Sequence, residues 1–147
     1  MAWIAITPDD VKTRLTGAEV AALKSVALAP GQGDPLDEII AHVTNEVRGY
    51  VAANVKNTLG AAGTIPAKLL SAALAIIRYR VATRLPTKSL LTEDRVREND
   101  AAIRLLERVA DDKFAIEDPI TGDVSGISIQ FVSTPTRLTS RQKLSGL

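Results

Sequence analysis

The sequence predicts a mainly α-helical fold: a small bundle of about four to five helices, followed by an extended C-terminal arm that contains a short strand or hairpin. Apolar residues recur at spacings of three and four along several stretches, which is the period of one helix face. A capping residue followed by proline marks two of the helix starts. Alanine occurs 21 times and aromatic residues make up 3% of the chain, so we expect closely approaching helices around a thin core.

The length of 147 residues suits a single core. We expect residues 1–118 to form the helical domain and residues 119–147 to form the arm. An alanine-rich core buries less apolar area per residue than Leu and Phe packing, at about 25 cal/mol per Å². This leaves room for oligomerisation to supply the remaining stability.

Composition excludes several classes of function. The chain has no cysteine, which rules out disulfides, thiolate metal sites and cysteine nucleophiles. Its longest apolar run is about nine residues, roughly half of a membrane span, and no basic segment precedes an apolar one at the start. We expect a soluble protein, made and kept inside a cell or packed into a particle.

The net charge is +1: −2 over residues 1–63, +3 over 64–113 and zero over 114–147. This is not the strongly basic charge distribution typical of a nucleic-acid-binding surface.

The first 33 residues predict an extended arm and two helices. Residues 1–6 alternate weakly, and Thr7, Pro8 and two carboxylates then predict a helix over residues 8–15. Thr16 and Glu19 have the spacing of a capping box, which predicts a helix over residues 17–28. Pro and Gly residues end it.

The clearest amphipathic helix begins at Asp34-Pro35. We expect its buried stripe to contain Leu36, Ile39, Ile40, Val43, Val47, Tyr50, Val51 and Val55. We expect its exposed face to carry Asp37, Glu38, Asn45 and Arg48. Residues 56–63 then predict a loop.

A central helix is expected from Pro66 to Arg84, with Pro86 stopping it. It is apolar nearly all round over residues 69–77, so we expect neighbours on every side. After a loop, Thr92 predicts the start of a last helix that runs to about Lys113. Its expected stripe is Val96, Ile103, Leu106 and Val109 or Ala110.

Beyond Phe114 the apolar density falls, and we interpret residues 114–147 as an arm whose order depends on a partner. Residues 127–132 alternate in the way of a short strand. Residues 133–147 are rich in Ser and Thr, carry three basic residues and have no acid.

Two polar groupings have a functional and a structural interpretation. His42 has Glu38 and Glu46 four residues to either side, which suggests a metal or base site, but no second His exists and we favour a solvated helix face. Carboxylate pairs also suggest acid–base or Mg²⁺ sites. Because three of the four pairs stand at helix starts, we favour capping: Asp9/Asp10, Asp37/Glu38, Glu93/Asp94 and Asp111/Asp112.

A basic cluster lies within residues 64–92, a stretch with no acid: Arg78, Arg80, Arg84 and Lys88. It could face nucleic acid or an acidic partner surface. The alternative, which we favour, is that these side chains complement the dipole at the end of the helix and cover the core with their stems. The glycine clusters match neither a dinucleotide fingerprint nor a P-loop.

The order of motifs in the central region resembles the tailed-phage head-tail connector (adaptor, or head completion) proteins, in their Mu-like branch. The motifs are Ile65-Pro66, Leu69-Leu70, Ala-Ile-Ile-Arg-Tyr-Arg over residues 75–80, and Arg-Leu-Pro-Thr over 84–87. Residues 102–110 and Lys113 resemble the end of that family's last helix, and the likeness covers about residues 3–118. The sequence departs from the family's pattern at two places. Asp112 stands where the family often has glycine, and residues 88–91 resemble an insertion before the last helix. We expect Asp112 to accept a left-handed cap.

The resemblance implies a structural virion protein with a helical connector domain, not an enzyme, with no cofactor, metal or membrane contact. Such proteins form a ring, usually of twelve copies, beneath the portal protein in the virion neck. The ring passes non-specific double-stranded DNA through its lumen and docks a tail-side stopper or tail terminator protein. The chain would be made in the host bacterial cytoplasm, and we expect it to be monomeric before assembly.

The resemblance also implies that the arm reaches the portal or a neighbouring subunit. The residues expected there are Ile127, Ile129, Phe131, Val132, Arg137, Arg141 and Lys143, while the basic cluster would face the lumen or a partner. An alternative of another class is a small helical DNA-binding regulator that places the basic cluster on phosphates. The near-zero net charge counts against it.

Overall fold

The computed structural model describes residues 3–25, 35–85 and 91–119. Its elements, in chain order, are β1 (Trp3–Ala5), α1 (Pro8–Lys12), α2 (Gly17–Ser25), α3 (Pro35–Ala53), β2 (Thr64–Pro66), the 3-10 helix η1 (Ala67–Leu69), α4 (Leu70–Arg84) and α5 (Glu93–Ala110). The predicted mainly α-helical fold is confirmed. Within these three ranges, no helix is both long and apolar enough to cross a membrane.

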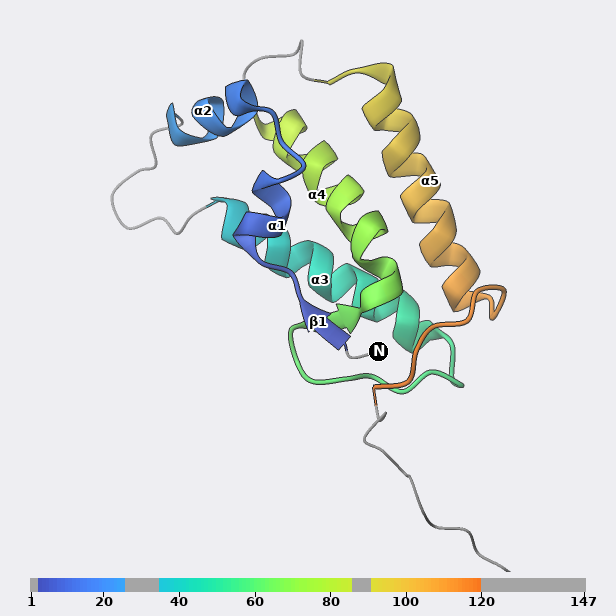
Figure 1. Cartoon of the computed structure of the whole chain (residues 1–147). Helices are drawn as coiled ribbons and strands as arrows, with labels where there is room; N and C mark the ends of the chain where they lie inside the picture. The colour runs from blue at the N-terminus through green and yellow to red at the C-terminus, as the bar shows by residue number, and fades with distance from the viewer. Residues whose placement is uncertain (1–2, 26–34, 86–90, 120–147) are drawn as a thin grey trace, which may run out of the picture.

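Three long helices form the body of the molecule. The helices α4 and α5 lie side by side and run in opposite directions, and α3 crosses them and packs against both (Figure 1). The short α1 contacts both α3 and α4. The core is therefore enclosed mainly by α3, α4 and α5.

The helix α4 is buried on most of its surface, as predicted. Its buried residues are Ala72, Ala73, Leu74, Ile76, Ile77, Val81 and Ala82. The predicted start at Pro66 is wrong, because Pro66 ends β2 and α4 begins at Leu70 after η1. Strand β2 pairs antiparallel with β1, with Ile4 opposite Ile65, so the N-terminal segment predicted to be extended is a strand fixed to the body.

Most of the predicted stripe of α3 is confirmed. Its buried residues are Leu36, Ile39, Ile40, Val43, Thr44, Val47 and Val51, and Tyr50 packs against them half-buried. The prediction for Val55 is wrong: its side chain is 96% exposed because α3 ends at Ala53. Arg48 was also predicted on the exposed face, yet it is half-buried against the loop that follows α3.

The stripe of α5 is shifted from the predicted one. Leu106 and Val109 are fully buried and Ile103 packs against the core, as expected. Val96 is 36% exposed, and the buried face there contains Arg95 and Asn99 instead. The side-chain period alone could not indicate this, because both buried residues are polar.

The helix ends follow the capping patterns in the sequence. Thr7 and Asp10 form a reciprocal capping box at the start of α1, and Thr16 and Glu19 make the same bonds at α2. Three carboxylate pairs lie in the first turns of α1, α3 and α5, as predicted. Thr92 is the N-cap of α5, although its side chain makes no capping hydrogen bond. Asp112 has the left-handed conformation expected for it, with φ 62°, just beyond the end of α5.

Residues 114–118 belong to the body of the protein. Phe114 and Ile116 pack against the core, and the Trp3 indole Nε1 donates to the Glu117 carbonyl at 2.9 Å. The prediction that the arm begins at Phe114 is therefore wrong for these residues. Residues 26–28 of the predicted second helix, the strand predicted over 127–132 and Lys88 lie outside the described residues.

Candidate interaction surfaces

The arginines of α4 are paired with carboxylates from the neighbouring helices. Arg78 lies 3.5 Å from the Glu98 carboxylate of α5, and Arg84 lies 3.8 Å from that of Glu38 on α3. Arg80 pairs with Glu46, also on α3. The basic cluster has no acid near it in the sequence, but the fold brings a carboxylate to each of its three described members.

The same pairs account for the surroundings of His42. Its imidazole is exposed on α3, and the two glutamates four residues to either side are the partners of Arg84 and Arg80. In the described ranges, no group of three His, Asp or Glu side chains is placed to hold a metal ion. The grouping around His42 therefore ties α3 to α4.

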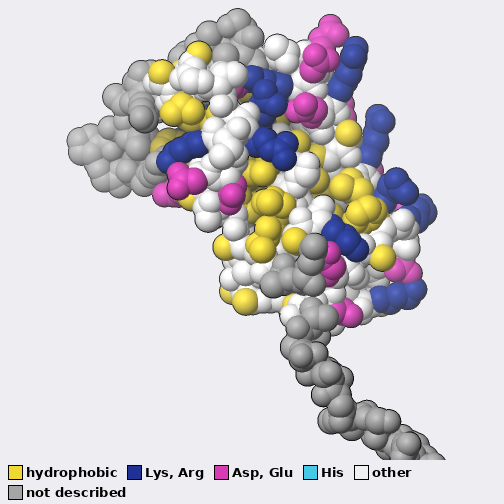
Figure 2. All heavy atoms as spheres, in the orientation of Figure 1, with side chains coloured by type: hydrophobic (Ala, Val, Ile, Leu, Met, Phe, Trp, Pro, Cys, Tyr) yellow, Lys and Arg dark blue, Asp and Glu magenta, His cyan; other side chains and the backbone are white. Residues whose placement is uncertain are grey.

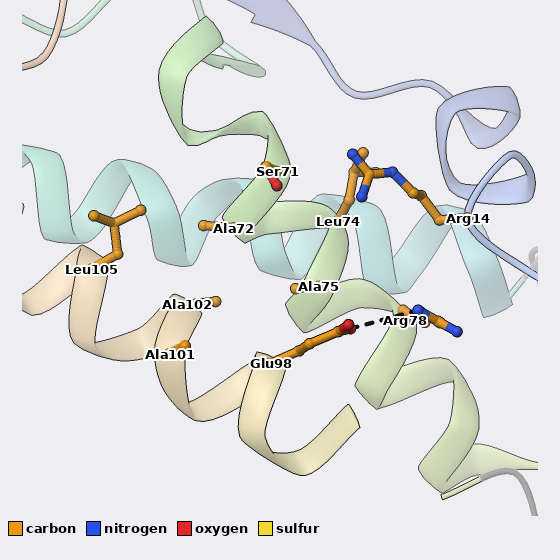
Figure 3. A pocket seen from close by; sticks show the side chains of 10 residues that line it. All are labelled: Arg14, Ser71, Ala72, Leu74, Ala75, Arg78, Glu98, Ala101, Ala102 and Leu105. Atoms are coloured by element: carbon orange, nitrogen blue, oxygen red, sulfur yellow. Dashed lines mark hydrogen bonds and ion pairs between the residues drawn. The ribbon is translucent and has the colours of Figure 1, made fainter. Parts of the chain in front are cut away.

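A groove of about 360 Å³ lies between α4 and α5. Its lining is made mostly of small and apolar side chains: Ser71, Ala72, Leu74, Ala75, Ala101, Ala102 and Leu105. Figure 3 shows Ala72 and Ala75 of α4 beside Ala101 and Ala102 of α5. Figure 2 shows hydrophobic side chains gathered on one face of the molecule, among basic ones. The alanine content predicted close helix approach, but it did not predict a groove along the seam.

Charged side chains occupy one end of the groove. Arg14, from the segment after α1, and Arg78 lie at this end, and Glu98 faces Arg78 across it (Figure 3). The Arg78 Nε is buried and has no hydrogen-bond partner. A ligand of this groove would bring apolar side chains and at least one hydrogen-bond acceptor.

A buried ion pair joins α2 to α5. The Glu19 carboxylate is 1% exposed and pairs with the Arg95 guanidinium, and it accepts from the backbone N and the hydroxyl of Thr16 at 2.7 and 2.8 Å. Burial by itself raises the pKa of Glu19, but the bonds from Thr16 and the Arg95 charge outweigh it, so the pKa is lowered overall. Sequence reasoning found the cap and missed this partner, which lies on another helix.

Arg48 fastens the loop between α3 and β2. Its guanidinium donates to the carbonyls of Gly60, Ala61 and Thr64 at 3.2, 2.8 and 2.7 Å, and its Cζ lies 5.7 Å from the centre of the Trp3 ring. A Cβ atom on Gly60 would lie 2.6 Å from that ring, so the loop needs glycine there. The N-terminal strand, this loop and residues 114–118 therefore meet at Trp3.

A hydrogen-bonded turn displays Val55. The Asn54 amide group donates to the carboxylate of Asp112 at 3.1 Å and accepts from the Lys56 backbone N at 3.0 Å, and Lys56 also pairs with Asp112. The hydrogen bond from Lys56, followed by that from Asn54, lowers the pKa of Asp112. Val55 is thus an apolar side chain held out in solvent by an ordered turn.

The described part is a small helical body in which several ion pairs join one helix to another. It carries a groove and a turn with an exposed apolar side chain, both of which another protein could contact.

The chain matches the protein family described as bacteriophage Mu, Gp36, over residues 6–126, and it belongs to that family. It is a Mu-like phage protein, and the family indicates a role in phage structure or morphogenesis. No curated protein matches the chain, and no solved structure does.

Proposed function

We propose that the chain is the head-tail adaptor of a Mu-like phage: a structural virion protein, without catalytic activity, that forms a ring of twelve copies beneath the portal. The ring gives DNA a channel and presents a docking surface to a tail-side stopper or tail terminator protein. It is made in the host cytoplasm and ends in the virion neck. The observation that carries the proposal is the family match, which spans the whole described body from Ile6 onward.

The organisation of the body supports an assembly role. Ion pairs join two glutamates of α3 to arginines of α4, and Glu19 of α2 to Arg95 of α5. These charged groups therefore connect helices instead of converging on a substrate. The groove and the Val55 turn remain as surfaces for other proteins. A ring subunit needs a firm body with such surfaces on it.

The pairing of the α4 arginines favours the adaptor over the DNA-binding regulator. Each arginine of the cluster that lies in the described part has a carboxylate within 4.0 Å, which weakens its attraction for phosphates. A regulator needs side chains free to reach phosphates and base edges. A lumen that only lets DNA pass has no such need, so we propose non-specific contact with DNA there.

The arm is the proposed contact to the portal or to a neighbouring subunit. Its strand-like residues 127–132 suit strand addition, in which backbone hydrogen bonds supply affinity and alternate side chains fill pockets. The basic residues Arg137, Arg141 and Lys143 would add charge contacts at the rim. Deleting residues 124–147 should then leave a folded body that no longer binds the portal.

The test is the size of the purified full chain, alone and mixed with portal rings of the same phage. Light scattering should give a monomer for the chain alone and a larger complex for the mixture, and imaging should reveal a ring stacked on the portal. Portal rings of an unrelated phage provide the control. Failure to associate with the cognate portal would contradict the proposal, and a salt-titrated DNA-binding assay would then test the regulator.

A further inference from the structure

We propose that, in the free subunit, the groove between α4 and α5 binds residues 127–132 of the same chain. The inference concerns the isolated chain and does not rest on the adaptor function. Four observations support it: the lining of the groove, the point where the described chain ends, the length of chain between that point and Ile127, and the polar groups at one end of the groove.

The lining suits a strand with large apolar side chains. Leu74 and Leu105 line the groove beside four alanines of the two helices. The alanines are Ala72, Ala75, Ala101 and Ala102. Alternate side chains of an extended segment point to one face, which would place Ile127, Ile129 and Phe131 together. Small residues in the groove and large ones in the arm are complementary in size.

The chain leaves the body next to the groove. Trp3 holds the Glu117 carbonyl at 2.9 Å, and the Glu117 carboxylate lies 4.0 Å from Lys68 Nζ in η1, immediately before α4. Ser71, three residues beyond Lys68, already lines the groove. The described residues end at Pro119, two positions after Glu117. The described chain therefore ends near the Ser71 end of the groove.

The intervening chain is long enough. The eight residues from Pro119 to Ile127 span at most about 26 Å when extended, at ~3.3 Å per residue. The groove follows α4 from Ser71 to Arg78, which is about 11 Å at ~1.5 Å per residue. A short flexible link also gives the segment a local concentration of roughly millimolar order, so its own groove is favoured over that of another copy in dilute solution.

The polar groups at the far end complete the fit. The buried Nε of Arg78 has no acceptor, and an extended backbone offers a carbonyl at every residue. Beyond that end, α5 begins with Glu93 and Asp94, whose side chains are 90% and 88% exposed and share one cation, Arg97. The arm beyond Val132 carries three basic residues and no acid, so the charges are complementary.

Cysteine cross-linking tests the proposal, because the chain contains no cysteine of its own. The test protein carries Ala101→Cys with Ile129→Cys. One control carries Gly49→Cys, at an exposed site on α3, with the same Ile129→Cys. A second control combines Ala101→Cys with Ser145→Cys. Under mild oxidation at micromolar protein, the test pair should form an intramolecular disulfide at least about tenfold faster than either control, at a rate independent of protein concentration.

Two results of the cross-linking would overturn the proposal. One is a rate for the test pair equal to the controls, and the other is a disulfide that forms only between copies and rises with concentration. Hydrogen exchange of the full chain gives a second measurement. Amides of residues 127–132 should be protected, and Ala101→Arg should remove that protection while leaving α3 unchanged. Absence of protection in the parent chain would also overturn it, whatever the outcome of portal binding.

Discussion

The carboxylate of Glu19 pairs with the guanidinium of Arg95 across the interface of α2 and α5, and both side chains are nearly removed from solvent. Half-buried Ala22 and Leu23 of α2 pack against the core nearby. The pair is therefore a principal attachment of α2 to the long helices, and its loss would remove one of two opposite charges that are buried together.

The pair predicts a large effect of a small substitution. Glu19→Gln should lower the free energy of unfolding by about 3 kcal/mol, because a buried ion pair loses one of its two charges. Urea unfolding measures the change. Glu107→Gln, at an exposed position of α5, is the control and should stay within about 0.5 kcal/mol of the parent. Equal effects of the two substitutions would contradict the role assigned to the pair.

The lowered pKa of Glu19 predicts a pH dependence. A carboxylate whose pKa is lower in the folded state stabilises fully above its unfolded pKa, about 4.3, and loses that contribution as the pH falls through the folded value. Asp10 and Asp112 also have lowered pKa values and share this acid dependence. Stability measured from pH 6 down to 2 should therefore fall less steeply for Glu19→Gln than for the parent. Parallel curves would mean that Glu19 does not contribute.

Gly60 should not tolerate alanine. The added Cβ would meet the Trp3 ring at 2.6 Å, and the resulting overpacking should cost about 1–3 kcal/mol. Gly49→Ala is the matched control: nothing lies within 4 Å of its Cβ, and alanine in the interior of α3 should stabilise by up to about 1 kcal/mol. Trp3 is the only tryptophan, so its fluorescence should shift to the red in Gly60→Ala alone. An unshifted spectrum would show that the ring is not held against the loop.

Arg48 should not be replaceable by lysine. One ammonium cannot reproduce a planar guanidinium that donates to three carbonyls and lies over Trp3, so Arg48→Lys should cost about 1–3 kcal/mol. Arg104→Lys, on the exposed face of α5, should be neutral. Hydrogen exchange should become faster in residues 60–64 in the first variant only. Unchanged exchange there would indicate that other contacts hold the loop.

The sequence predicted the helices that are determined by residues close together in the chain. The spacing of apolar residues located α3 and α5, and the Thr7 and Thr16 caps fixed the starts of α1 and α2. The β1–β2 pair escaped prediction because each strand has three residues and the two lie far apart in the chain. Val55 continued the period of α3 by chance, beyond the turn that ends the helix.

The interaction surfaces were harder to predict than the helices. Arg78, Arg80 and Arg84 formed an evident basic cluster, but their carboxylate partners on α3 and α5 become neighbours only once the helices pack. The same holds for Glu19 and Arg95. The sequence indicated Glu19 only as part of a cap, and nothing near Arg95 in the sequence indicated a buried partner. The groove depends on which alanines face one another across α4 and α5, and composition cannot specify that.

The most direct test of the adaptor role uses a phage in which the gene for this chain carries a stop codon. Extracts of infected cells are imaged and titrated for infectious particles before and after the purified protein is added. The adaptor role predicts DNA-filled heads without tails, which the protein converts into tailed, infectious particles. Normal tailed particles in its absence would contradict it.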